Sequence, residues 1–290
     1  MFQFRLKHNH RFSKISVLAC ALACVLIFLK HAQADTGASE ELSLDSGFRY
    51  LYNLDFESAH KTFEAWQEDY PDDPMGAASN AAAYLFGEFD RLHILELSRF
   101  LDNRKFGEGN KFTPDPKVKA AFEAELAKAD DIAEKILARS ADDSNALLAR
   151  TLSDGMRADY AVLIAQQTRT GLNFLKSSRS FAEKLIRIDP DCHDAYLALG
   201  IENYILGLRS APTRWMLRLS GAQTNKDKGI EYLKITAEKG RYLGPYARLL
   251  LAIAALRDQD KTTAKKLLSD LAREFPQNRL YQLELARLRS

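Results

Sequence analysis

The segment LSLDSGFRYLYNLDFESAHKTFEAWQEDYPDDP, at residues 42–74, carries the clearest structural pattern in this chain. Small, aromatic and proline residues recur in it at regular spacing: Gly47, Tyr50, Ala59, Phe63 and Pro71. The spacing predicts two helices that cross closely where the side chains are small, with aromatic rings filling the space beside the crossing. Pro71 ends the second helix because proline has no backbone N–H and disfavours helix in the preceding residue. Such a hairpin cannot bury its apolar face alone, so we expect it to stack on neighbouring hairpins.

The spacing G-x2-Y-x8-A-x3-F-x7-P resembles one tetratricopeptide (TPR) repeat, a helix–turn–helix unit of about 34 residues. Ala81 and Tyr84 follow Gly47 and Tyr50 by 34 positions, so the phase is kept into the next unit. Residues 244–276 match the TPR pattern well, as does the segment DPDCHDAYLALGIENYILG. The chain is also similar to a group of exported bacterial TPR proteins with no assigned activity. The resemblance implies an all-α fold, a TPR-like helical-hairpin solenoid with helical insertions.

The expected domain covers residues 35–290. Its repeats are placed at about residues 40–73, 74–102, 116–142, 144–190, 192–240 and 244–276, followed by a capping helix at residues 278–289. Residues 89–101 are expected to form an amphipathic helix, and residues 103–116 an exposed insertion rich in glycine, proline and charge. Residues 144–167 predict a long helix in which Gly155 is a candidate kink. Residues 209–221 break the repeat phase and are expected to be an exposed loop.

Residues 1–34 have the pattern of a secretory signal peptide. A basic start precedes an apolar run at residues 15–29, and Ala32-Gln33-Ala34 supplies small residues for cleavage. The run is shorter than the roughly 20 residues of a spanning helix. We expect cleavage before Asp35 and a periplasmic or secreted protein. The alternatives are an uncleaved anchor in the inner membrane and a lipoprotein modified at Cys20 or Cys24, which is disfavoured because the apolar run continues beyond both cysteines.

Loss of this segment changes the charge balance of the chain. The whole chain has 41 basic and 39 acidic residues, and the segment carries five basic and no acidic ones, which leaves 36 and 39, a formal net charge of −3. A weakly acidic chain gives no case for nucleic acid as a partner. Cys192 is the one cysteine after residue 34, so the mature chain cannot form an internal disulfide.

Two clusters of polar residues are candidates for chemistry. Residues 191–194, Asp-Cys-His-Asp, offer four metal-ligand types in a row, but adjacent residues point in different directions, and metal sites favour spacings such as C-x2-C. An aspartate after a proline is instead expected to cap the following helix. Asp90, His93 and Glu96 lie on one helix face, which we expect to be solvated. The sequence has no phosphate loop, nucleophile elbow or Cys–His pairing, so we expect no catalytic, cofactor-binding or metal-binding residues.

The inner, concave face of the array is the candidate binding surface, because the first helix of each TPR hairpin lines it. The positions assigned to partner binding come from three repeats and from the segment that interrupts one of them: Phe48, Tyr52, Leu85, Phe86, Ile201, Tyr204, Arg214 and Trp215. If the groove is open, its aromatic side chains suit an apolar peptide or helix. If inserted helices fill it, the same residues are core. Arg214 and the adjacent Trp215 have two alternative roles: an internal hydrogen-bonding or stacking pair, or a contact with a ligand.

The sequence therefore predicts a non-catalytic scaffold that holds a protein or peptide partner at the bacterial cell envelope. The alternative is an α-helical enzyme or small-ligand-binding protein with its site in the concave face. An open groove would favour the scaffold, and a deep pocket with two facing carboxylates would favour hydrolytic chemistry. No cofactor is implied, and a membrane contact is expected only through an uncleaved N-terminal anchor.

Overall fold

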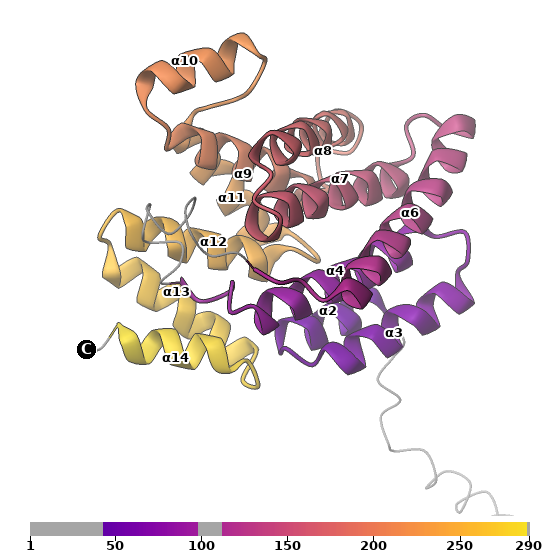
Figure 1. Ribbon diagram of the computed structural model, residues 1–290, viewed down its shortest axis with the longest axis horizontal. Coiled ribbons are helices and arrows are strands. Elements are labelled where there is room, and N and C mark those ends of the chain that lie inside the picture. The colour runs from indigo at the N-terminus through magenta and orange to yellow at the C-terminus, as the bar shows by residue number, and fades with distance from the viewer. Residues whose placement is uncertain (1–42, 98–111, 289–290) are drawn as a thin grey trace, which may run out of the picture. The chain divides into compact units, whose positions relative to one another are not determined.

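The structure, a computed structural model, describes residues 43–97 and 112–288, and all regular structure in those residues is helical (Figure 1). The all-α prediction is confirmed for this part of the chain. The expected signal peptide at residues 1–34 lies outside the described residues, as does most of the expected insertion at residues 103–116, so both stay predictions. No helix in the described residues combines the length and the apolar character that a membrane span requires.

The helices keep the labels of Figure 1. Their bounds are α2 Leu44–Tyr52, α3 Phe56–Asp69, α4 Pro74–Arg91, α6 Pro116–Arg139, α7 Ser144–Asp159, α8 Thr168–Ile188, α9 Tyr196–Gly207, α10 Ala211–Leu219, α11 Lys226–Lys239, α12 Gly244–Arg257, α13 Lys261–Glu274 and α14 Arg279–Arg287. A π-helical turn, η1 Tyr160–Ile164, follows α7, and a 3-10 turn, η2 His193–Ala195, precedes α9.

The first hairpin, α2 with α3, forms where its sequence pattern predicts. The chain turns at Leu54, which adopts a φ of 63°, and Asp55 then caps α3 by accepting a hydrogen bond from the backbone N–H of Ser58 at 3.1 Å. The ring of the fully buried Phe63 occupies the space that a side chain at Gly47 would need. Glycine at this position therefore allows the two helices to cross closely.

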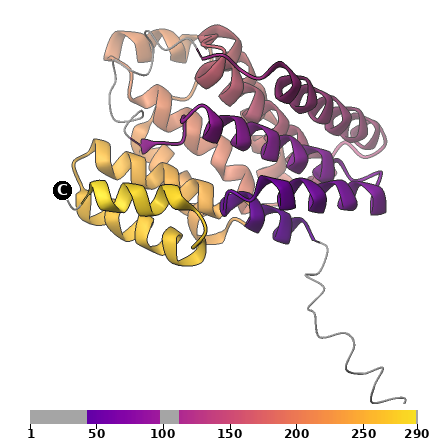
Figure 2. The same ribbon diagram turned by 60° about the horizontal axis from the view of Figure 1, so that its bottom comes forward.

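Successive helices form a series of hairpins (Figures 1 and 2). The pairs are α2 with α3, α4 with α6, α7 with α8, α9 with α11, and α12 with α13, and α14 packs on α13. Each hairpin also contacts the next one along the chain. In addition α2 contacts α4, and α4 contacts α7, so the first helices of these three hairpins share one layer.

The hairpin of α4 and α6 differs from the expected repeat boundaries. Sequence reasoning placed separate units at residues 74–102 and 116–142, with a helix over residues 89–101. Instead α4 ends at Arg91 and the chain turns at His93, whose φ is 56°, a left-handed value that a helix cannot continue through. The next long helix, α6, packs against α4. The two expected units are therefore the two halves of one hairpin.

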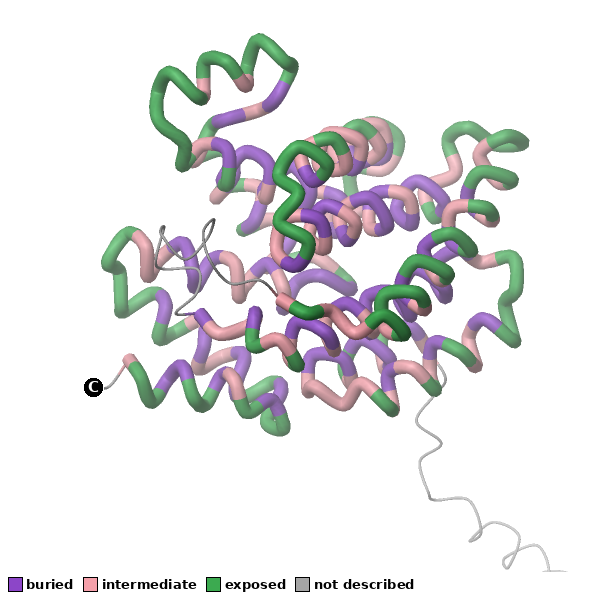
Figure 3. Tube along the Cα trace, in the orientation of Figure 1, coloured by how far each residue is buried: buried purple, intermediate pink, exposed green. Residues whose placement is uncertain are grey.

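Residues 209–221 also differ from expectation, because most of them are helical. α10 has nine residues, and Pro212 lies in its first turn, where a missing backbone N–H breaks no helical hydrogen bond. The helix is inserted between α9 and α11, which pack against each other directly. None of its residues is buried, and Figure 3 shows it as an exposed segment.

The last helices of the unit return to its first helix. The Tyr52 hydroxyl donates to the Tyr242 carbonyl at 2.9 Å, and the Asn278 side-chain amide donates to the Tyr52 carbonyl at 2.8 Å. Arg241 pairs with Asp45 at 2.6 Å on the same side. In an open solenoid each unit contacts only its neighbours. The hairpins of this protein instead form a closed arrangement, which encloses their inner face.

Candidate functional site

Three of the predicted groove residues belong to the core, and two of them lie between the first and last hairpins. Phe48 and Tyr52 on α2 and Leu85 on α4 are at most 6% exposed. The ring of Phe48 stacks on that of Tyr242 with centroids 5.0 Å apart, and the Tyr52 ring lies 5.4 Å from that of Phe275. All three are core, as the filled-groove alternative expects, but Phe48 and Tyr52 are covered by the last hairpin and the loop before it, not by an inserted helix.

Two cavities remain on the inner face. The inner cavity has a volume of about 70 Å³ and is lined by residues of α2, α4, α7, η2, α8, α9 and α12. The outer cavity has a volume of about 440 Å³ and is lined by residues of α7, η1, α8, α9, α11 and α12 and by the segment that leads into α10. Four residues line both cavities: Asp159, Leu175, Ile201 and Tyr246. The outer cavity has a size typical of ligand pockets, roughly 300–1,000 Å³.

The lining of the outer cavity is mainly aliphatic, with a few polar groups. The polar or charged residues along it are Asp159, Thr168, Tyr204, Arg209, Ser210, Tyr246 and Arg257. Arg209 is exposed and Arg257 is half-buried. Apolar walls with a small number of placed polar groups are the usual composition of a binding pocket.

Asp159 places a carboxyl group where the two cavities meet. It is the last residue of α7, directly before the π-helical turn, and such turns recur at functional sites. Its carboxyl accepts a hydrogen bond from the Tyr246 hydroxyl at 3.3 Å, and no ion pair to it forms within the described residues. Burial raises the pKa of Asp159 to about 7. Near neutral pH the group therefore exists in both charged and neutral forms.

Tyr204 is a second polar residue in the wall of the outer cavity. Its side chain is 7% exposed, and its hydroxyl has no hydrogen-bond partner within the described residues. Burial raises the pKa of Tyr204 to about 12, so the hydroxyl stays protonated and can donate. A buried polar atom without a partner costs free energy, about 1–3 kcal/mol. The hydroxyl is shielded from solvent, so it does not face the open space of the cavity, although Tyr204 forms part of the cavity wall.

The structure brings some of the predicted site residues together and separates others. Phe86 and Ile201, both half-buried, line the inner cavity with Phe48 and Tyr52, and Ile201 and Tyr204 line the outer one. Arg214 and Trp215 lie apart on α10. Arg214 donates to the Arg209 carbonyl at 2.8 Å, which is an internal contact. The structure thus divides the predicted set into core, cavity and α10 residues.

Sequence reasoning missed Asp159, Tyr246 and the π-helical turn. The sequence made Gly155 a candidate kink in this helix, but α7 continues through Gly155 to Asp159. Gly155 lines the inner cavity instead. The available signal was the single acidic residue in the run MRADYAVLI, at residues 156–164.

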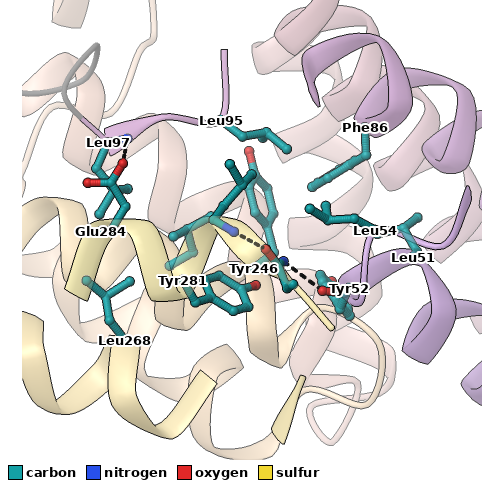
Figure 4. Close-up of a pocket in the computed structure, with 13 residues that line it drawn as sticks. Leu51, Tyr52, Leu54, Phe86, Leu95, Leu97, Tyr246, Leu268, Tyr281 and Glu284 are labelled. Carbon is teal, nitrogen blue, oxygen red and sulfur yellow. Dashed lines mark hydrogen bonds between the residues drawn. The ribbon is translucent and has the colours of Figure 1, made fainter. Parts of the chain in front are cut away.

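A third hollow, beside Tyr52 and Tyr246, is too small for a ligand (Figure 4). Its volume is about 20 Å³, which leaves room for about one water molecule. The Glu284 carboxylate at its edge accepts from the backbone N–H of Leu97 at 3.3 Å. It is a packing gap between the first and last hairpins.

The run at residues 191–194 has a structural role that differs from the expected helix cap. No side chain caps η2 or α9. The buried Asp194 carboxylate reaches away from its own helix and accepts backbone N–H groups of Arg241, Tyr242 and Leu243 at 3.1, 3.1 and 2.9 Å. The described residues hold no group of three or more His, Cys, Asp or Glu arranged for a metal ion. Asp194 therefore anchors the loop between α11 and α12.

Comparison of the chain with models of known protein families finds no match, and neither does comparison with curated proteins.

Proposed function

We propose that this protein is a non-catalytic, TPR-like scaffold that binds an apolar segment of a protein or peptide partner, with the outer cavity as the anchor site. The observation that carries the proposal is the outer cavity itself. It is about 440 Å³ in volume and mainly aliphatic, with a few polar residues along its wall. Apolar walls with a few placed polar groups fit a ligand that brings mainly apolar surface and a few polar groups, as an apolar peptide segment does.

The arrangement of hairpins supports the TPR-like part of the proposal. Gly47 lies against Phe63 at the helix crossing of the first hairpin. The small residues Ala59 and Ala81 are fully buried, as the repeat phase requires. The layer of α2, α4 and α7 corresponds to the stacked first helices of such repeats.

Closure changes how a TPR-like array would bind. An extended peptide cannot run along an inner face that is filled by Phe48, Tyr52 and Leu85. One or two apolar side chains can instead enter the outer cavity, because buried anchors carry most of the binding energy at protein interfaces. The exposed Arg209 then lies beside the partner's backbone or an acidic side chain.

A second candidate, a small amphiphilic ligand with an acyl chain, is favoured by the contact between the two cavities. Asp159, Leu175, Ile201 and Tyr246 line both, so the two cavities are neighbours, and movement of these side chains would let an elongated chain extend from the outer into the inner cavity. A catalytic function has less support, because hydrolytic chemistry on sugars uses paired carboxylates. Asp159 is the one acidic side chain among the described residues that line the outer cavity.

Site-specific photo-cross-linking tests the proposal. Ile205 is 36% exposed and lines the outer cavity, so a benzophenone side chain at this position would contact a bound partner. Leu283 on α14 is 41% exposed, lies outside that cavity, and serves as the matched control. We expect a discrete cross-linked protein or peptide from position 205 and none from position 283. Ile201→Phe with Leu250→Phe in the same chain fills the cavity and should weaken that cross-link.

Two outcomes would change this conclusion. Cross-linking of a lipid or another small molecule at position 205 would favour the second candidate. Identical products from positions 205 and 283, or none from either, would contradict binding at the outer cavity.

We also propose export to the cell envelope, supported by the sequence pattern of residues 1–34. N-terminal sequencing of protein recovered from the envelope should give a start at Asp35. An intact Met1, or a lipid-modified start at Cys20 or Cys24, would contradict it.

A further inference from the structure

α10 carries its apolar face toward solvent. Of the eight large apolar side chains that are exposed in the described residues, five lie between Ile205 and Leu219. On α10 these are Trp215, Met216 and Leu219, which are 63%, 65% and 69% exposed. A helix on the surface of a soluble domain usually turns its apolar side toward the core.

The geometry of the helix explains this orientation. At about 100° per residue, the exposed apolar residues of α10 fall on one side within an arc of about 140°. These residues are Ala211, Pro212, Trp215, Met216 and Leu219, and all five are exposed. The half-buried residues, Arg214 and Leu217, lie on the opposite side, toward the hairpin of α9 and α11. The apolar face is thus a continuous outward surface.

Internal contacts hold the helix in this orientation. Arg214 donates to the carbonyl of Arg209 at 2.8 Å, and Arg218 donates to the Thr224 hydroxyl at 2.7 Å. Lys176 on α8 donates to the Ser220 carbonyl at 3.0 Å, at the end of α10. Polar side chains therefore fasten both ends of the helix to the rest of the unit, and its apolar side stays outward.

The charge of this region indicates what covers the apolar face. Residues 203–226 contain no aspartate or glutamate. Arg209, Arg214 and Arg218 form no ion pair with any described residue. Arg214 contacts a backbone carbonyl and Arg218 a hydroxyl oxygen. A second copy of this chain would bring these arginines against one another, because a two-fold interface pairs a patch with itself. An anionic surface complements them.

We propose that α10 is an interfacial helix that docks on a bilayer containing anionic lipids. Trp215, Met216 and Leu219 would enter the region between headgroups and acyl chains, and the exposed Arg209 and Arg218 would contact lipid phosphates. This is the composition of helices that lie in a membrane surface, with a basic edge beside an apolar face that includes tryptophan. The inference goes beyond partner binding and does not depend on what occupies the outer cavity.

Trp215 provides a local test of docking. The chain has two tryptophans, Trp66 and Trp215, so Trp66→Phe in the full chain leaves Trp215 as the single reporter. Vesicles of phosphatidylcholine with phosphatidylglycerol should shift its emission to the blue, and brominated acyl chains should quench it. Vesicles of phosphatidylcholine alone should have little effect. The Trp215→Phe chain, which reports Trp66, should respond to neither, and residues 1–42 are identical in every variant.

Matched variants separate α10 from other surfaces. Leu219→Ser should reduce partition onto anionic vesicles, whereas Leu283→Ser, which removes an exposed leucine from α14, should not. Arg209→Gln and Arg218→Gln should each lower partition about fivefold at low salt. An unshifted Trp215 on anionic vesicles would overturn the proposal. A blue shift that needs no lipid and grows with protein concentration would overturn it in favour of self-association.

Discussion

Single residues divide into those whose role follows from local pattern and those whose role depends on distant parts of the chain. Gly47 and Ala59 could be assigned from repeat spacing, because the partners they meet lie within the same hairpin. Asp159 could not be assigned, since its surroundings come from α7, α8, α9 and α12, and the sequence does not show that these meet. The role of Asp194 could not be predicted either, because its partners at residues 241–243 are distant in the sequence.

The first residue-scale prediction concerns the half-buried carboxyl of Asp159. Its pKa is about 7 in the folded protein, against about 4 in the unfolded chain. The folded state therefore binds more protons between these values, so wild-type stability falls as pH rises from about 4 to about 7. Asparagine does not ionise, so the stability of Asp159→Asn should not show this fall. The free energy of unfolding of the variant relative to wild type should therefore rise by about 2–3 kcal/mol from about pH 5 to about pH 8.

Urea unfolding of both proteins at the two pH values measures this gain. Asparagine retains an acceptor for the Tyr246 hydroxyl, so the local hydrogen bond is preserved. A stability difference that stays constant with pH would show that Asp159 titrates normally and is exposed to water.

The second residue-scale prediction concerns Asp194. Asp194→Asn should destabilise the protein by about 1.5–3 kcal/mol, because hydrogen bonds from backbone N–H groups to a charged acceptor are weakened. Asp191→Asn, in the same run but exposed, is the control and should be close to neutral. Chemical denaturation measures both. Equal effects of the two substitutions would mean that the anchor to the loop between α11 and α12 contributes little.

At the scale of elements, caps and prolines predicted where helices begin, and repeat phase predicted the first hairpin. Asp115 with Pro116 at the start of α6 is one example. Two elements were missed for physical reasons. α10 looked like a loop because Pro212 interrupts the repeat phase, although proline is compatible with a first helical turn. The π-helical turn after Asp159 has no local sequence rule.

The element-scale prediction tests the helix crossing in the first hairpin. Ala59 is fully buried, so Ala59→Leu should overpack the contact of α2 with α3 and cost about 1–3 kcal/mol. Ala65→Leu on the same helix changes a half-buried position and should be tolerated better. Thermal and urea unfolding give the comparison. Equal melting temperatures for wild type and Ala59→Leu would show that the assigned repeat phase is wrong.

At the scale of the whole unit, Ser43–Ser290, closure is the feature that sequence could not predict. It rests on contacts such as Tyr52 with Tyr242 and Asn278, which are 190 and 226 positions apart in sequence. Repeat spacing reports only neighbours, so it predicts hairpins but not whether the series stays open. Closure also decides the site, because it turns an expected groove into a packed interface and two cavities.

Closure should make unfolding cooperative across the unit. Leu268 in α13 is fully buried, and Leu268→Ala should lower stability by about 2–5 kcal/mol. In a Trp215→Phe background the emission of Trp66 reports the first hairpin, and far-UV circular dichroism reports all helices. The unfolding midpoints that the two probes report should fall together when Leu268→Ala is introduced. A Trp66 transition that stays in place while the dichroism shifts would indicate independent units, as in an open solenoid.

The outer cavity as a binding site for an apolar group is the central claim, and titration with the apolar dye anilinonaphthalene sulfonate tests it most directly. The variant Ile201→Phe with Leu250→Phe fills the cavity, and Leu283→Phe is the matched surface control. Wild type and control should bind the dye saturably with equal affinity, and the filled variant should lose that binding by at least about tenfold, a change of about 1.4 kcal/mol. Equal binding by all three proteins would contradict the claim.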